Sequence, residues 1–267
     1  MQHLRAFAAA ALAAALAACA SPEAPPVDAG GPKVGVVVLH GKWGDPYGAT
    51  LKFTRTLIRE GFLTDSPEMP WSARRSYDTG VDGAMKEIDA AVSRLKSRGA
   101  EKVFVVGHSL GAAAAVRYAT SHRVDGLIAL APGHFPEGPR FHERVEGSLQ
   151  KAKSMPPGAL DYFDDPNSGN RMKPMRMSAR VYLDYFDPSG PMNFHRNVAA
   201  LRPGTPILWV VGDFEDPSVR KADEALFQAL PRSPPPKFVE VSASHLETPD
   251  AAGKASTDWI RQVVAVK

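Results

Sequence analysis

The sequence has 267 residues, of which 44% are hydrophobic and 23% are charged, an ordinary composition for a globular protein. This length suits one large α/β domain. The 32 basic and 29 acidic residues are interspersed and give a net charge of +3. No stripe of Lys and Arg of the kind that binds nucleic acid stands out, so we expect no nucleic-acid partner.

The N-terminus resembles a bacterial lipoprotein signal peptide, predicted over residues 1–18. Arg5 supplies a positive charge, and the apolar run after it is too short to span a bilayer. Leu16–Cys19 resembles a lipobox, and Cys19 is the only cysteine of the chain, which excludes internal disulfides. The resemblance implies a lipid anchor on Cys19 and a place in the cell envelope, on the outer membrane facing the periplasm. An ordinary secretory signal is the alternative.

The body of the chain is expected to be α/β, with a mostly parallel sheet flanked by helices. Residues 19–32, rich in Pro, Gly and Ala, predict a flexible tether, and residues 33–267 predict the folded domain. Short apolar runs alternate there with helical periodicity, as crossover helices between parallel strands require. The expected strands cover 34–39, 102–106, 126–131, 206–211 and 237–241; helices are expected near 48–59, 83–98, 219–230 and 256–266, and directly after Ser109.

An insertion separates the expected strands 126–131 and 206–211. It covers about residues 134–200, too long for a simple loop, and its aromatic content argues against disorder. We therefore expect a small, largely helical cap. Asp161–Asp165 and Asp184–Asp187 invite a metal-site reading, but they lack EF-hand spacing, and we interpret them as solvated cap surface. We expect no metal and no cofactor.

A serine stands at a sharp boundary in Glu101–Gly111, which reads EKVFVVGHSLG. Gly107 and Gly111 bracket Ser109 in a G-x-S-x-G motif, with an apolar strand before it and an alanine-rich helix after it. Such a turn leaves no room for side chains at the two glycines and exposes the serine hydroxyl above a helix N-terminus. Ser109 is therefore the candidate nucleophile.

Across nearly all of residues 33–267, the chain resembles the α/β-hydrolase family. That family places its triad in the chain order serine, acid, histidine. Of the eight histidines, only His245 follows a late strand and precedes a terminal helix. The others lie in the signal, in earlier motifs, near the insertion or beside the nucleophile. The resemblance thus implies His245 as the base.

The acid is expected in the segment GDFEDPSV, just after the strand 206–211. Family members commonly carry Gly-x-x-Asp-Pro there, whereas this chain has one extra residue between Gly212 and the Asp-Pro pair. The Asp-Pro match favours Asp216, and counting from the glycine favours Glu215. We predict Asp216, with Glu215 and Asp213 as alternatives.

An oxyanion hole needs two N–H donors aimed at the developing negative charge. The first is expected from Leu110, directly after the nucleophile. His40, Gly41 and Gly44 resemble the HG-x-x-G loop of the family, which presents the backbone N–H of the residue after His-Gly, here Lys42.

Together these elements predict a serine hydrolase that cleaves carboxylic esters or related small acyl compounds through an acyl-serine intermediate. One alternative is a cell-envelope peptidase or amidase that uses the same triad. Another is a non-catalytic envelope lipoprotein that uses the fold for binding.

Overall fold

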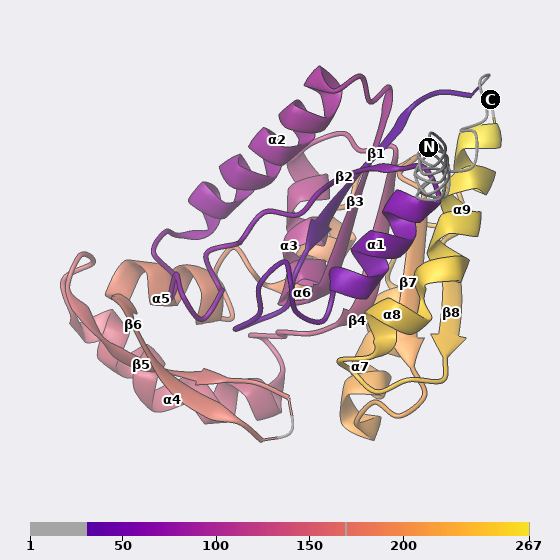
Figure 1. Cartoon of the computed structure of the whole chain (residues 1–267). Coiled ribbons are helices and arrows are strands. Elements are labelled where there is room, and N and C mark those ends of the chain that lie inside the picture. Colours follow the sequence, from indigo (N-terminus) through magenta and orange to yellow (C-terminus); the bar gives the residue numbers. More distant parts are fainter. Residues whose placement is uncertain (1–30, 169, 267) are drawn as a thin grey trace, which may run out of the picture. The chain divides into compact units, whose positions relative to one another are not determined.

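The computed structural model describes residues 31–168 and 170–266, so the predicted signal peptide and Cys19 lie outside the described residues. Six strands form one parallel sheet in the order β2-β1-β3-β4-β7-β8, and the helices lie on both of its faces (Figure 1). The predicted fold class is confirmed. The strands are β1 Val34–Leu39, β2 Leu63–Asp65, β3 Lys102–Ser109, β4 Gly126–Pro132, β7 Ile207–Gly212 and β8 Lys237–Val241.

Alternating side chains of the buried strands enter two separate cores. In β1, Val37 and Leu39 pack into one core, and Val36 and Val38 pack into the other. The first core includes residues of α2 (Val81–Ser97), α3 (Leu110–Ser121) and α7 (Pro217–Gln228). The second includes residues of α1 (Leu51–Arg59) and α9 (Gly253–Ala265), next to the short α8 (Thr248–Ala251). Two apolar faces explain why these strands lack polar alternation.

The insertion between β4 and β7 contains the expected helices and one element that was not predicted. Its helices are α4 (Pro139–Ser154), α5 (Ala179–Phe186) and α6 (Phe194–Ala199). Between α4 and α5, β5 (Leu160–Pro166) and β6 (Met172–Ser178) form an antiparallel hairpin. The hairpin buries one face: Phe163 stacks on Tyr182 of α5 with ring centroids 4.6 Å apart. Tertiary packing therefore stabilises strands whose sequence, with its Asp and Pro residues, has weak β-propensity.

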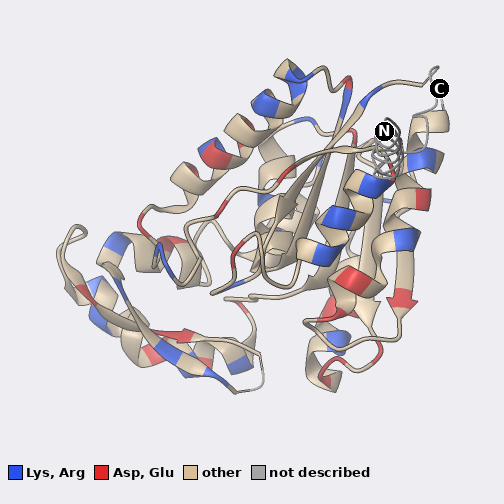
Figure 2. Cartoon of the chain, viewed as in Figure 1, with Lys and Arg blue, Asp and Glu red and all other residues tan. Residues whose placement is uncertain are grey.

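Charged residues lie mostly on the helices, the loops and the hairpin, whereas the large sheet is almost free of them (Figure 2). Within the described ranges, no helix combines the length and the apolar character needed to cross a membrane.

Candidate active site

Strand β3 ends at Ser109, whose backbone has a positive φ of 55° with ψ −120°, a conformation that residues other than glycine rarely adopt. The turn is crowded on both sides. A Cβ on Gly107 would lie 2.0 Å from the carbonyl oxygen of Gly111, and one on Gly111 would lie 2.5 Å from that of Leu39. Only glycine fits at either position, and the strain at Ser109 matches the strain commonly held at functional sites.

The candidate base, His245, and an acid meet at the end of the sheet where Ser109 lies. His245 follows β8, and its Nδ1 hydrogen donates to Oε2 of Glu215 at 2.5 Å. The Glu215 side chain is 4% exposed and that of His245 is 13% exposed. Because the carboxylate accepts from Nδ1–H, the opposite ring nitrogen Nε2 is left to accept a proton.

In this geometry Glu215, the alternative acid, contacts His245, and the preferred Asp216 does not. The Asp216 side chain caps helix α7 by accepting from the Ser218 N–H, and it lies 3.7 Å from Arg140 at the surface. Asp213, the third candidate, accepts from the Ala243 N–H at 2.9 Å and so joins the ends of β7 and β8. The Asp-Pro pair marks a helix start here, because proline suits the first helical turn and aspartate suits the N-cap.

Ser109 and His245 face one small space. A Cβ placed on Gly133 would lie 2.9 Å from Ser109 Oγ and 3.7 Å from His245 Cε1. Ser109 is 7% exposed. Within the described residues no hydrogen bond joins the hydroxyl to the imidazole, and such bonds often tighten only in the substrate complex. The candidate nucleophile and base are nevertheless neighbours.

A second histidine, which the sequence did not single out, fixes the loop of His245. The ring of His108, inside the elbow, donates from Nε2 to the His245 carbonyl oxygen at 2.9 Å. Burial, followed by the nearby His245, lowers the pKa of His108 to about 3. His108 is therefore neutral, with its proton on Nε2, since a carbonyl can only accept.

The predicted oxyanion loop packs against the elbow. A Cβ on Gly41 would lie 3.2 Å from Ser109 Cβ, and the Gly44 N–H closes a turn on the Gly41 carbonyl oxygen at 3.1 Å. In the described part of the chain, the backbone N–H of Lys42 has no protein acceptor, and Leu110 opens helix α3. Lys42 and Leu110 stay candidate oxyanion donors, and the loop and the elbow that carry them are in contact.

His40 braces the start of this loop. Its Nδ1–H donates to the Gly41 carbonyl oxygen at 2.8 Å, and its Nε2 accepts from the Met69 N–H at 2.9 Å. Burial lowers the pKa of His40, against the raising effect of its bond to Gly41. The neutral imidazole therefore joins the loop after β1 to the segment after β2.

Asp165 corrects the interpretation of Asp161–Asp165 as solvated surface. Asp165 is 0% exposed, and its carboxylate accepts from Lys42 Nζ at 2.6 Å. Among the described residues, no cluster of three or more His, Cys, Asp or Glu side chains is placed to hold a metal ion.

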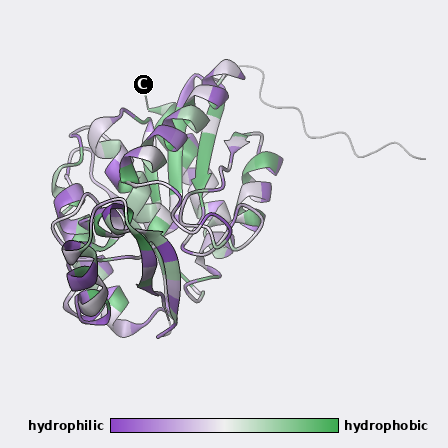
Figure 3. Ribbon diagram, turned by 90° about the vertical axis from the view of Figure 1, so that its left-hand side faces the viewer, coloured by the Kyte–Doolittle hydropathy of each residue, from purple (hydrophilic) through white to green (hydrophobic). Residues whose placement is uncertain are grey.

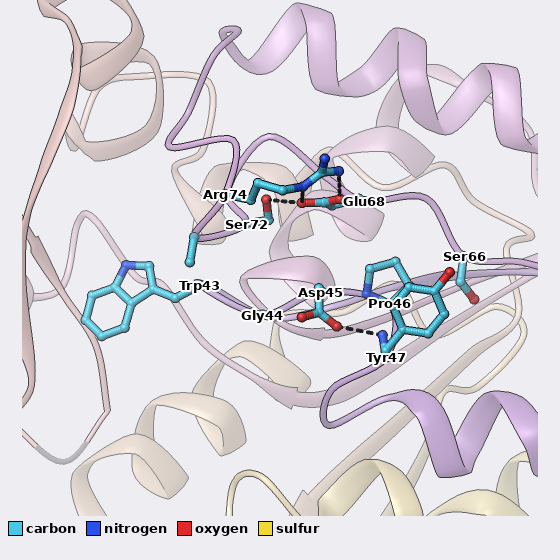
Figure 4. Close-up of a pocket in the computed structure, with 10 residues that line it drawn as sticks. Trp43, Gly44, Asp45, Pro46, Tyr47, Ser66, Glu68, Ser72 and Arg74 are labelled. Carbon is cyan, nitrogen blue, oxygen red and sulfur yellow. Dashed lines mark hydrogen bonds and ion pairs between the residues drawn. The ribbon is translucent and has the colours of Figure 1, made fainter.

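A cavity of about 520 Å³ borders the same loop. Trp43 and Tyr47 come from the loop itself, whereas Glu68 and Arg74 come from the segment after β2, where they are hydrogen-bonded to each other (Figure 4). The lining mixes aromatic and charged side chains, and it contains none of Ser109, Glu215 and His245.

Residues 36–253 match the family model described as the alpha/beta hydrolase family. The chain belongs to the alpha/beta hydrolase family. The match covers most of the folded domain and all three of Ser109, Glu215 and His245. No significant match was found among the curated proteins.

Solved structures of hydrolases share the fold at low identity. Est1E from Butyrivibrio proteoclasticus is 17% identical with a TM-score of 0.63, covering 88% of this chain and 90% of that one. The monoacylglycerol lipase of Paleococcus ferrophilus is 24% identical with a TM-score of 0.59, covering 86% and 94%. The esterase domain of a Rhodothermus marinus protein is 20% identical with a TM-score of 0.62, covering 90% and 91%. At these identities the likeness establishes the fold alone.

Proposed function

We propose that this alpha/beta hydrolase is a serine hydrolase that cleaves carboxylic esters or related acyl compounds through an acyl-serine intermediate. The observation that carries the proposal is the Glu215–His245 hydrogen bond of 2.5 Å, formed beside the strained Ser109. A serine hydroxyl is a poor nucleophile at neutral pH, and an imidazole oriented by a carboxylate is the usual way to activate it.

In the proposed reaction, Ser109 Oγ attacks the acyl carbonyl carbon while His245 Nε2 takes the hydroxyl proton. Glu215 holds the Nδ1–H and stabilises the imidazolium that forms. The oxyanion of the tetrahedral intermediate accepts hydrogen bonds from the backbone N–H groups of Lys42 and Leu110. His245 then protonates the departing alkoxide, which leaves as the alcohol.

Deacylation repeats these steps with water as the nucleophile. His245 removes a proton from the water as it attacks the acyl carbon, and returns the proton to Ser109 Oγ when the ester bond breaks. His108 holds the His245 backbone by its 2.9 Å hydrogen bond and so keeps the imidazole in register with the elbow.

A fluorophosphonate probe tests this proposal directly. The probe is expected to label the wild type at Ser109, and Ser109→Ala should lose both the label and the hydrolysis of short p-nitrophenyl esters. Full esterase activity in the alanine variant would refute the assignment. Amide substrates, tested beside the esters, separate an esterase from a peptidase or amidase on the same triad.

We also propose that the protein is anchored in the bacterial cell envelope by lipid on Cys19, with the outer membrane as its location. The support is the lipobox-like Leu16–Cys19, with the only cysteine of the chain at the required position. Metabolic labelling with a fatty-acid analogue is expected for the wild type and should be lost in Cys19→Ser. Label that persists in the variant would contradict the anchor.

A further inference from the structure

Asp165 on the hairpin is the centre of a buried polar network. Its Oδ1 accepts from Lys42 Nζ at 2.6 Å, and its Oδ2 accepts from Trp43 Nε1 at 2.7 Å and from the Tyr77 hydroxyl at 2.9 Å. The hydrogen bonds therefore satisfy both oxygens of a carboxylate that is 0% exposed. Breaking the set would leave unpaired polar groups in a dry environment.

Two of the three donors are consecutive residues of the loop that carries the proposed oxyanion donor. Trp43, next to Lys42, has a positive φ of 59°, a strained conformation for a large side chain. It is held from two sides, because its backbone N–H donates to the Trp71 carbonyl oxygen at 2.9 Å and its indole donates to Asp165. The hairpin thus fixes the loop one residue from the N–H of Lys42.

The buried charge of Lys42 makes the position of the loop depend further on Asp165. Its side chain is 4% exposed, its Nζ also donates to the Pro166 carbonyl oxygen at 2.6 Å, and it lies 5.3 Å from the Phe141 ring and 5.1 Å from the Phe186 ring. Burial lowers the pKa of Lys42, and Asp165 opposes that effect. Without the carboxylate, the ammonium would be favoured to move toward water, and the loop would move with it.

We propose that Asp165 is a positioning residue for the oxyanion hole, acting from the insertion through the side chains of Lys42 and Trp43. The inference rests on the proposed acyl-transfer function, because it concerns the N–H that would bind the oxyanion. The insertion would then have a positioning role in catalysis. When the hairpin packs against the loop after β1, that loop holds the geometry that the tetrahedral intermediate requires.

A matched pair of variants separates positioning from mere stability. Trp43→Phe and Tyr77→Phe each remove one neutral donor to the same Oδ2 atom, but only Trp43 belongs to the oxyanion loop. Trp43→Phe is expected to lower kcat by about 10-fold or more with KM within about 2-fold, since small misplacement of a catalytic group is costly. Tyr77→Phe should change kcat by less than about 2-fold, even if its Tm falls as far as that of Trp43→Phe.

Asp165→Asn gives the larger test, with Asp161→Asn as its control. Asp161 lies on the same strand and pairs with Lys151 at the surface, at 2.8 Å. We expect Asp165→Asn to lower kcat by about 100-fold and to weaken binding of an alkyl boronic acid, which forms a tetrahedral adduct with the serine, by a similar factor. Asp161→Asn should leave both values unchanged.

These experiments distinguish failure of the positioning role from failure of the proposed hydrolase function. If the wild type neither reacts with fluorophosphonate nor hydrolyses esters, both proposals are wrong. An active wild type with equal kcat losses in Trp43→Phe and Tyr77→Phe, or with boronic-acid affinity untouched in folded Asp165→Asn, overturns the positioning role alone. Should Asp165→Asn fail to fold, the comparison of the two phenylalanine variants still decides.

Discussion

The large sheet and the β5–β6 hairpin are held in place by different physics. The strands of the sheet are almost uniformly hydrophobic, whereas the hairpin alternates hydrophilic and hydrophobic residues (Figure 3). Apolar burial is non-directional and tolerates small changes of shape. The hairpin adds a few directional polar contacts, centred on Asp165, that end on the loop of Lys42. A single polar substitution in the hairpin should therefore lower activity and stability far more than the deletion of a single methyl group in the sheet.

The largest expected effect concerns the proposed triad at the end of the sheet. Glu215→Gln should lower kcat by about 10⁴-fold, the typical cost of losing the carboxylate that orients a catalytic imidazole. Its matched control is the neighbouring Asp216→Asn, which keeps the helix cap, because asparagine caps as well as aspartate. Steady-state kinetics on a p-nitrophenyl ester measure both variants. A severe loss in Asp216→Asn together with a mild one in Glu215→Gln would restore Asp216 as the acid.

The loss of stability on substitution should also be larger in the hairpin than in the sheet. Asp165→Ala leaves the Lys42 ammonium buried without its partner, which typically costs about 3–5 kcal/mol. Ile128→Val in β4, where the side chain is 0% exposed, removes one methyl group and should cost about 0.5–1.5 kcal/mol. Urea denaturation at pH 7 measures both changes in the free energy of unfolding. Equal costs would mean that the buried pair contributes no more than ordinary packing.

Acid should destabilise the protein through its buried neutral histidines. Burial is the main cause that lowers the pKa of His40, His108 and His134, that of His108 to about 3. Below pH 6.5 the unfolded chain takes up protons at these residues that the native state refuses, so stability is full above pH 6.5 and falls as pH decreases.

For His108 this loss should extend to about pH 3, with a slope near 1.4 kcal/mol per pH unit. His108→Gln, which keeps an N–H donor for His245, should flatten the fall in unfolding free energy between pH 6 and 4. An unchanged slope in the variant would show that His108 accepts a proton in the native state.

A smaller expected effect than that of His108, and one of opposite sign, is a gain of stability. Asp223 in α7 is 0% exposed, its carboxylate oxygens have no partner among the described residues, and burial, followed by the charge of Glu215, raises its pKa well above the ordinary value. Folding therefore takes up a proton above the ordinary aspartate range, and stability falls as pH rises. Asp223→Asn should raise the unfolding free energy at pH 8 by about 0.5–2 kcal/mol and by less at pH 4. A loss at pH 8 would contradict this.

The sequence predicted five of the six strands of the sheet, because buried parallel strands are short apolar runs with no polar face to obscure the pattern. It missed β2, a three-residue edge strand that reads Leu-Thr-Asp. Ser109 and His245 could be located because local motifs and chain order mark them. The structure places both residues at the same end of the sheet, where both lie next to Gly133.

The remaining site residues depend on contacts that local sequence does not encode. Glu215 and Asp216 are adjacent, and which one faces His245 depends on where helix α7 begins. Asp165 looks like a surface acid among aromatic residues, yet its partner Lys42 is 123 positions away. The two charges come together only when the hairpin packs against the loop after β1. Neither sequence segment alone could therefore predict the pair.

Trapping of the acyl-enzyme is the decisive experiment for the proposed acyl-serine intermediate. Purified protein is mixed with a slowly hydrolysed p-nitrophenyl ester, quenched with acid and examined by intact and peptide mass spectrometry. We expect a burst of p-nitrophenol together with a stoichiometric acyl adduct on Ser109, which accumulates in the wild type and does not form in Ser109→Ala. Steady turnover of the ester with no adduct on Ser109, or with the adduct on another residue, would contradict it.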